Sequence, residues 1–583
     1  MYSRILVDHV NIFVAFVIIS TAFVLSAFSF LLPNCSNAND FYALFSFVSL
    51  DAAVLWADIL AGYALWMLMI YLTDVWKLKL THAAGIVNVF LGLVGVIPFV
   101  LQFIVDSFLG NFWILLASSL SYCAGMGILS MSTPPVLADT LHTCNAYAPE
   151  CISNAHRMLF FAAVVLIAVG ISGHSVCLGS FLVEQSVELG LIEFSGRSLL
   201  TMFAGNWPTF VFTMIVASAL PYIKPWSLRF GIPAIFMVLA TLVFLSRSCS
   251  YSRDRPEGSP LTLLLKVLSA AAFKLFVPRP PTLSQYHGVA EYSVLVHEIP
   301  PLRCCRCLEK AAIILPNQTL EQQVQNQWKL STLTQVRNAQ YIIFMIPLAM
   351  AFALWGLISS LSYTYFVEQA KTMNRKVGSL SVPITILLWF WAQGRRLFPR
   401  LLCSLWYVPI AGIATSMILG VVCCITAGSV ESRRLNMVRK HDLRHKPDAE
   451  VPMSVFWLVP QFVLLGAVDG LLEFCTAAIL MNKFVFSWWK FMLNFINLVH
   501  GFGCFGSVLL VYIAGGVSDG EGHSGWFQDS LNESRIDKYY WMMAWLIACN
   551  VVPYWMLTCW YSHMNQKEQI VPGETQPFCC CCC

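Results

Sequence analysis

The chain has 583 residues, of which 58% are hydrophobic and 11% are charged. A soluble globular protein of this length cannot hide so much apolar surface, so the composition excludes that class. The net charge of +4 is small and indicates no nucleic-acid partner. Apolar runs of about 20 residues recur along the chain, and each is long enough to cross a bilayer as a helix. The sequence therefore predicts an all-α polytopic membrane protein.

The expected membrane spans fall into two sets of six around a long polar connection. The first set is 50–73, 83–104, 112–132, 156–178, 199–222 and 229–246. The second set is 340–366, 380–393, 404–429, 454–481, 487–514 and 538–561. Two helical halves around a central loop are the layout of a rocker-switch transporter. We therefore expect an N-terminal half at 50–246, a central loop at 247–338 and a C-terminal half at 339–561.

The two ends of the chain lie outside these halves. The extension 1–49 carries one more apolar run, 10–32, which fits an extra helix, a signal peptide or a misjoined gene model. The symmetry of the two halves favours treating this run as an addition. The tail 562–583 ends in five consecutive cysteines, which are candidates for S-acylation near a membrane. They are Cys579, Cys580, Cys581, Cys582 and Cys583.

The charge of the central loop bears on its side of the membrane. It holds eleven lysines or arginines against six acids. Its stretch 261–276 has helical apolar spacing with two lysines, which predicts an amphipathic helix at the membrane surface. Basic loops favour the cytosolic side. The connection with Arg395, Arg396 and Arg400 then falls on the same side by parity and agrees, whereas one other basic connection disagrees. That connection holds Arg433, Arg434, Arg439, Lys440, Arg444 and Lys446.

Several strings are more specific when read in order. They are "FIVDSFLGNF" with Asp106 and Gly110, "FGIPA", "GSPLT", "LEKAAI", "FVEQAKTMNR", "RRLNMVRKHDL" before "VPMSVFWLVPQF", and "LNESRIDKYYW". Together they resemble the plant nitrate transporter 1/peptide transporter family, a branch of the proton-dependent oligopeptide transporters. The resemblance covers about residues 51–561. It implies a major facilitator fold with 12 core helices, a substrate between the two halves, and a central loop and core termini in the cytosol.

The resemblance also locates positions where this chain departs from the family pattern. The family's Glu-x-x-Glu-Arg/Lys motif on the first core helix, linked to proton coupling, corresponds here to Val54, Ala57 and Asp58. Both acids are lost, and the basic residue is replaced by an acid. A family lysine on the fourth core helix corresponds to Ser175, which follows His174. The glutamate facing that lysine corresponds to Asp469 on the tenth core helix.

These departures change the expected electrostatics. Asp58, Asp469 and Glu473, one turn after Asp469, lack an obvious basic partner on these helices. His174 can replace part of the missing positive charge, because histidine titrates near neutral pH. We hypothesise that proton coupling runs through Asp58, His174 and Asp469. The structural alternatives are that Asp58 only supports packing, that His174 bonds a neighbouring carbonyl, and that Glu473 is a solvated acid in a vestibule.

The expected substrate is a small solute. Family members carry nitrate, peptides, hormones or glucosides, and a nitrate transporter among them uses a histidine that corresponds here to Ser359. The remaining candidates for the cavity lining are mostly neutral, which favours a neutral or weakly charged organic solute and leaves nitrate open. They are Ser175, Ser359, Ser362 and Thr364. The alternative function is a transporter-like receptor or regulator without solute flux.

Other site types have little support in the sequence. No nucleophile–base or metal-ligand constellation is visible, so we expect neither an enzyme nor a metal or cofactor. Asp106 and Gly110 match the gating loop of the major facilitator superfamily, but Asn111 stands where an arginine is usual. Asn532 begins an Asn-x-Ser match in the last external loop and is a glycosylation candidate. The expected location is the plasma membrane or the vacuolar membrane, and the oligomeric state is not indicated.

Overall fold

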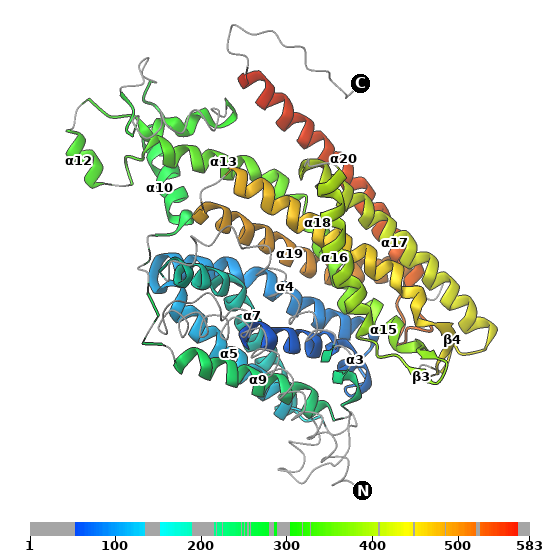
Figure 1. The fold of residues 1–583 in the computed structure, drawn as a ribbon. Coiled ribbons are helices and arrows are strands. Elements are labelled where there is room, and N and C mark those ends of the chain that lie inside the picture. The colour runs from blue at the N-terminus through cyan, green and yellow to red at the C-terminus, as the bar shows by residue number, and fades with distance from the viewer. Residues whose placement is uncertain are drawn as a thin grey trace.

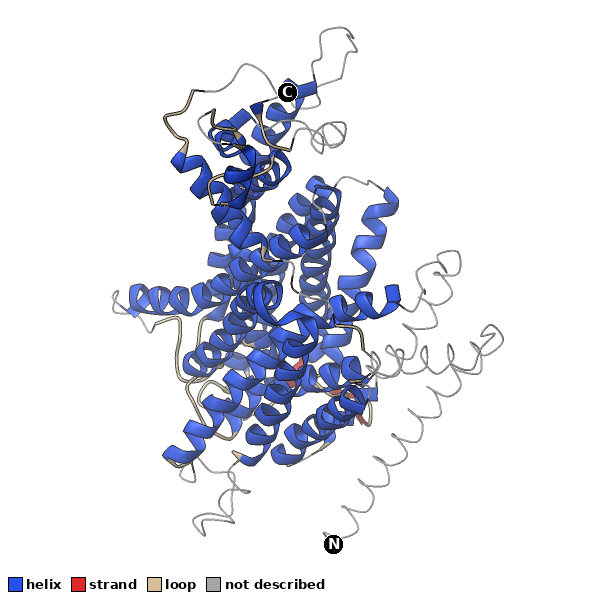
Figure 2. Ribbon diagram, turned by 90° about the vertical axis from the view of Figure 1, so that its left-hand side faces the viewer, coloured by secondary structure: helices blue, strands red, loops and turns tan. Residues whose placement is uncertain are grey.

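The structure is a computed structural model. It describes residues 53–133, 152–188, 215–278 with short gaps, 285–288, 303–519 with short gaps, and 525–569. The apolar run 10–32, most of the expected span 199–222 and the cysteine tail lie outside the described residues. Figure 2 shows that helices make up nearly all of the described chain. This confirms the all-α fold class.

The N-terminal half contains helices that match the expected spans. The first helix runs over Ala53–Asp74 and ends in α3 (Leu68–Asp74). The others are α4 (Leu80–Ile104), the π-helical turn η2 (Val105–Leu109), α5 (Gly110–Met131), α7 (Asn154–Glu188), the short η5 (Leu220–Tyr222) and α9 (Trp226–Ser246). Gly110 separates η2 from α5 with a φ of 72°, a conformation that glycine adopts without strain. The expected loop between the second and third spans is therefore the short break formed by η2 and Gly110.

The C-terminal half repeats this arrangement. Its first span is bent and consists of α13 (Leu333–Met350), α14 (Ala353–Ser359), η8 (Ser360–Tyr363) and α15 (Tyr365–Thr372). The others are α16 (Ile386–Leu405), α17 (Pro409–Lys440), η9 (Val455–Leu458) with α18 (Val459–Lys483), α19 (Phe486–Asp519) and α20 (Ile536–Gln569). Figure 1 shows this half, coloured from green at α13 to red at α20, beside the blue to green helices of the N-terminal half.

Length and apolarity support membrane crossing for most of these helices. Among the described residues, eight helices meet both criteria, or nine if the bent span counts as one. One of the eight, Leu80–Met131, covers two expected spans because α4 and α5 are joined through η2. The helix α16 is not among the eight. It carries Arg395, Arg396 and Arg400 between its middle and its C-terminal end.

The central connection forms a small helical module at one end of the molecule. It contains α10 (Pro260–Phe273), the 3-10 helix η7 (Arg303–Ala312) and α12 (Leu320–Gln325). The predicted amphipathic helix is present as α10, and Val267 and Ala270 on one of its faces are buried in a cluster with η7 and α13. Phe273 and Phe276 remain exposed. The helix therefore docks on the protein through part of its apolar surface.

Short strands mark the opposite end, which we call the strand end. There β1 (Met373–Asn374) pairs in parallel with β4 (Val451–Ser454), and β2 (Lys376–Val377) forms a hairpin with β3 (Leu380–Ser381). Figure 1 shows α15, β3 and β4 together at this end, far from α10 and α12. The other end is called the central-loop end below.

The two halves meet where α4 packs against α19. A Cβ atom added to Gly95 would lie 2.6 Å from the Cα of Gly501, and one added to Gly501 would lie 2.7 Å from the carbonyl oxygen of Gly92. Small residues let two membrane helices approach this closely. Backbone packing of α4 on α19 is therefore a main contact between the halves.

Candidate functional site

The structure brings Asp58 and His174 together inside the N-terminal half. Nδ1 of His174 lies 2.9 Å from Oδ1 of Asp58, and its Nε2 lies 2.9 Å from the hydroxyl of Ser119 on α5. The ring of Tyr122 packs edge-on against the imidazole. The His174 side chain is only 3% exposed, whereas that of Asp58 is 28% exposed. Three helices thus hold an imidazole between a hydroxyl and a partly accessible carboxylate.

Asp469 lies in the C-terminal half and accepts three side-chain hydrogen bonds. The indole of Trp355 donates to Oδ1 at 2.6 Å, and the hydroxyl of Ser359 donates to the same oxygen at 3.0 Å. The indole of Trp391 donates to Oδ2 at 2.8 Å. A carboxylate suits this arrangement, because it offers acceptor positions on both oxygens. Ser359 therefore contacts Asp469 directly, and neither residue belongs to the lining of the cavity described below.

Glu473 has a basic partner on α16, contrary to the expectation that it lacks one. Nε and Nη2 of Arg395 on α16 donate to its Oε2 at 3.0 and 2.5 Å. Half of the Glu473 side chain is exposed. The pair therefore lies at an open surface, and Glu473 is neither fully solvated nor isolated.

The remaining positions of the family motifs take no part in these clusters. Val54 and Ala57 are buried in the apolar core. The Ser175 hydroxyl donates to the carbonyl oxygen of Ser172, and the residue is exposed beside the buried His174. Ser362 and Thr364 likewise bond carbonyl oxygens of their own helical turns.

A cavity of about 840 Å³ lies between the first helix, α16 and α18. Its lining includes Arg395, Arg396, Arg400 and Glu473, together with several aromatic side chains. This corrects the expectation of a mostly neutral lining, which considered no residue of α16. The sequence did hold a signal for a charged lining from α16. Trp391 and Arg395 lie one turn apart in the string "WFWAQGRRLFPR" and so share a helix face.

Polar contacts join the two halves at the strand end. Nζ of Lys371 on α15 lies 2.5 Å from Oδ1 of Asp74 at the end of the first helix. The Thr73 hydroxyl donates to Glu368 at 3.2 Å, and the Trp66 indole donates to the carbonyl oxygen of Ser362 at 2.9 Å. These contacts close the strand end of the space between the first and seventh spans. The cavity described above extends from there toward the central-loop end, along the second half of α16.

The gating-loop residues make local contacts and one contact across the halves. Nε2 of Gln102 donates to Asp106 at 2.7 Å. Asn494 on α19 donates to the Gln102 amide oxygen at 3.0 Å. Asn111, at the position of the usual arginine, donates to Glu184 on α7. Asp106 is therefore linked to the C-terminal half through Gln102 and Asn494.

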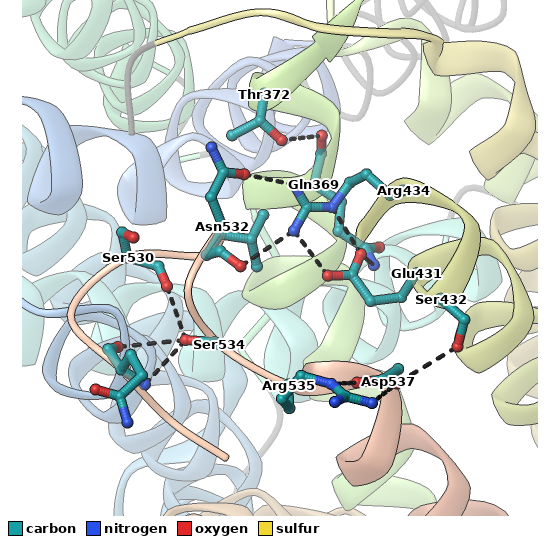
Figure 3. Close-up of polar contacts among 12 residues, drawn as sticks. Gln369, Thr372, Glu431, Ser432, Arg434, Ser530, Asn532, Ser534, Arg535 and Asp537 are labelled. Atoms are coloured by element: carbon teal, nitrogen blue, oxygen red, sulfur yellow. Dashed lines mark hydrogen bonds and ion pairs between the residues drawn. The ribbon is translucent and has the colours of Figure 1, made fainter. Parts of the chain in front are cut away.

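A buried polar network lies in the C-terminal half near the strand end (Figure 3). Arg434 and Glu431 on α17 are both fully buried and make two hydrogen bonds with each other, each 2.8 Å long. Gln369 on α15 donates to Glu431 at 2.7 Å, and Gln461 on α18 donates to Gln369 at 3.1 Å. Arg434 also donates to Asn532 at 2.7 Å.

This network corrects two expectations. Arg433, Arg434, Arg439 and Lys440 lie within α17, because that helix continues to Lys440 and not only to residue 429. They therefore belong to a helix, and Arg434 compensates a buried glutamate. Asn532 is 4% exposed and its amide donates to the carbonyl oxygen of Lys446, so the predicted glycosylation site is wrong.

Within the part of the chain that the structure describes, no group of histidine, cysteine, aspartate or glutamate side chains could hold a metal ion. The candidate site therefore consists of a polar cluster in each half and the arginine-lined cavity.

Comparisons with known proteins agree with this architecture. The model of the POT family matches residues 112–514. The chain is 38% identical over 535 residues to "Protein NRT1/ PTR FAMILY 5.5" of Arabidopsis thaliana, a match that covers 89% of this chain and 97% of the relative. It is 28% identical over 508 residues to "Protein NRT1/ PTR FAMILY 5.6" of the same plant, covering 83% of this chain and 85% of the relative.

Solved structures share the fold at low sequence identity. The structure of an "auto inhibited POT family peptide transporter" has a TM-score of 0.59 at 15% identity and covers 91% of this chain and 99% of that chain. The structure of the "POT family transporter PepTSo" has a TM-score of 0.57 at 14% identity and covers 88% of this chain and 98% of that chain. These matches confirm the resemblance stated from the sequence motifs, and they are to transporters, not enzymes. The chain is a multi-pass membrane transporter that belongs to the POT family.

Proposed function

We propose that this POT family member moves nitrate or a small organic solute by alternating access, with proton movement coupled to transport at the Asp58–His174 pair. The observation that carries the proposal is the 2.9 Å contact between the Asp58 carboxylate and the His174 imidazole. Such a pair can share or exchange one proton, because a carboxylate and an imidazole each bind a proton reversibly.

The position of the pair supports a role in coupling. Asp58 is on the first helix, whose other end contacts Glu368 and Lys371 of the C-terminal half through Thr73 and Asp74. A change in the proton occupancy of Asp58 changes its attraction to His174 and hence the packing of the first helix on α7. Because the same helix makes contacts that close the strand end, proton binding can bias the equilibrium between the two transport conformations.

Asp469 is the counterpart in the other half. Its three donors come from α14 and α16, so it connects the seventh and eighth spans to the tenth. We infer that it holds these helices together while the cavity is formed, and that the proton relay is centred on Asp58 and His174.

Uptake measurements test the proposal. Oocytes that display the protein at their surface are given nitrate, dipeptides and small organic solutes at about pH 5.5 and about pH 7.5, which bracket the range in which histidine titrates. Flux that rises at acid pH supports coupling. Flux that is indifferent to pH contradicts coupling and indicates a facilitator. Absence of flux for the whole panel contradicts the transport proposal and favours the receptor or regulator. A fluorescent fusion tests location at the plasma or vacuolar membrane.

A further inference from the structure

The cavity between the first helix, α16 and α18 holds more positive than negative charge. Three of its lining residues are arginines, and one is a glutamate. All three arginines lie between the middle and the C-terminal end of α16 and line the cavity from this one helix. A membrane protein keeps charges inside its bundle where they have a function or a partner.

One of these arginines is already engaged. Arg395 donates twice to Glu473, and its guanidinium lies 5.4 Å from the centre of the Trp391 ring. Its charge is therefore largely balanced by the Glu473 carboxylate, and its position is fixed by Glu473 on α18 and Trp391 on α16. It forms one wall of the cavity.

The other two arginines are available for a ligand. Arg396 and Arg400 are exposed to the cavity, and neither forms an ion pair or hydrogen bond with another described residue. They are four residues apart, so their side chains project from adjacent turns of the same helix face. Guanidinium groups placed in this way match the geometry of carboxylate, sulfonate or phosphate oxygens.

The rest of the lining is aromatic. Tyr63 and Trp66 contribute from the first helix, Tyr363 and Trp391 from the C-terminal half, and Phe474 from α18. The volume of about 840 Å³ lies within the range of roughly 300–1,000 Å³ that is typical of sites for drug-sized ligands. A small inorganic anion would occupy only a fraction of this space and would leave the aromatic walls without contact.

We propose that the cavity binds an organic anion, with its acidic group at Arg396 and Arg400 and its apolar or aromatic body against Tyr63 and Trp391. This inference rests on the proposed transport function, because it names the substrate class of the same protein's cavity. The acidic group would enter near the central-loop end, and the apolar body would reach toward the closed strand end.

Equilibrium binding to the purified full-length protein tests the inference without requiring flux. The probes are benzoate, phenylacetate and 2-naphthoate, the neutral amide of each, and nitrate, measured by isothermal titration calorimetry in detergent. We expect at least one carboxylate to bind about tenfold or more tightly than its amide, since charge-assisted contacts to arginine are roughly twice as strong as neutral ones. Nitrate is expected to bind more weakly than that carboxylate.

Variants identify the arginines responsible. In the doubly substituted Arg396→Gln, Arg400→Gln protein, the preference for the carboxylate over the amide should disappear, while amide binding is unchanged. The lysine double variant Arg396→Lys, Arg400→Lys should retain part of the preference. Arg433→Gln is the matched control, because Arg433 is an arginine on α17 that lies over Trp457 and not in the cavity. It should bind as the wild type does.

The outcomes separate the two proposals. No binding of any probe, equal binding of carboxylate and amide, or an unchanged preference in the glutamine double variant overturns the organic-anion inference. Nitrate that binds as tightly as the best carboxylate also overturns it. If the carboxylate binds but no condition gives uptake, the inference stands and the transport proposal fails.

Discussion

At the scale of single residues, Asp58 is the position where the proposed coupling can be removed with the smallest change. Asp58→Asn keeps the size of the side chain and a contact to His174 but cannot bind or release a proton. We expect acid-stimulated uptake to fall by roughly 5- to 150-fold, the range of ordinary coupling free energies between sites. Uptake at about pH 5.5 and about pH 7.5 should then be nearly equal.

The control for this variant is Ser119→Ala, which removes the hydroxyl from the other side of His174 and leaves the Asp58–His174 contact in place. It should retain the acid stimulation. Asp58→Asn with the full acid stimulation of the wild type would show that coupling uses another group.

The sequence predicted some of these residues and missed others for a physical reason. Asp58 was found because an acid is unusual inside an apolar span, and His174 because it stands beside the position of a family lysine. Ser119 gave no such signal, since serine is common in membrane helices and most often bonds its own backbone. The arginines of α16 were predicted only as loop charges, because they lie beyond the apolar first part of a helix that is not apolar enough to qualify as a membrane span.

Lys274 offers a prediction outside the membrane spans. Its side chain is 2% exposed, and Nζ donates to the carbonyl oxygens of Ala311 at 3.1 Å and Ile313 at 2.7 Å. Burial lowers the pKa of Lys274 to about 8, from an ordinary value of 10.5. Between these values the unfolded chain binds more protons than the folded module, so this lysine makes the module more stable as the pH rises.

Limited proteolysis of the central connection measures this effect. Protection of the wild type, normalised to an unstructured peptide, should increase between about pH 7.5 and about pH 9.5. In Lys274→Met this increase should be absent, and Lys329→Met, which removes an exposed lysine of the same module, should behave as the wild type does. A wild-type protein whose protection decreases over this interval would contradict the assigned direction.

At the scale of elements, the sequence predicted the helix α17 but not its C-terminal extension. Its apolar run ends near residue 429, but the helix continues to Lys440 because Arg434 and Glu431 are satisfied by each other and by Gln369 and Asn532. An apolarity pattern cannot reveal such a pair, since the partners come from other elements. The burial of Asn532 could not be predicted for the same reason, because its partners Arg434 and Lys446 come from another part of the chain.

The buried Glu431–Arg434 pair predicts a large loss of stability when only one partner is removed. Arg434→Met leaves the Glu431 carboxylate buried without its cation, which typically costs about 3–5 kcal/mol. The double variant Glu431→Met, Arg434→Met should recover most of this loss, since apolar residues of similar volume often replace a buried pair. Thermal unfolding of the purified protein in detergent measures both.

Arg433→Met is the matched control, because the neighbouring guanidinium lies over Trp457 and makes no buried ion pair. Its unfolding temperature should stay close to that of the wild type. If Arg434→Met unfolds at the wild-type temperature, the network does not hold α15, α17 and the 525–535 segment together.

At the scale of the whole molecule, the two-half architecture was predictable because apolar runs of about 20 residues recur on both sides of a polar connection and because the family motifs occur in order. The cavity was not predictable, because it depends on which faces of the first helix, α16 and α18 meet. The contact between α4 and α19 was also hidden. Glycines in apolar spans are common, and nothing in their spacing alone identifies Gly501 as the partner of Gly92 and Gly95.

That contact yields a prediction about the conformational change. A side chain at Gly501 would meet the carbonyl oxygen of Gly92 at 2.7 Å and the backbone of Gly95 and Val96 at 3.0 Å, and backbone atoms cannot move aside as a side chain can. Gly501→Val should therefore separate the halves at a cost of about 1–3 kcal/mol and lower the unfolding temperature. Uptake should fall more than the amount of folded protein does, because separating α4 from α19 disturbs the movement of one half against the other that alternating access requires. Gly506→Ala on the same helix meets nothing within 4 Å and should leave stability and uptake unchanged. Equal behaviour of the two variants, in melting and in uptake per folded molecule, would mean that the halves do not turn about the α4–α19 contact.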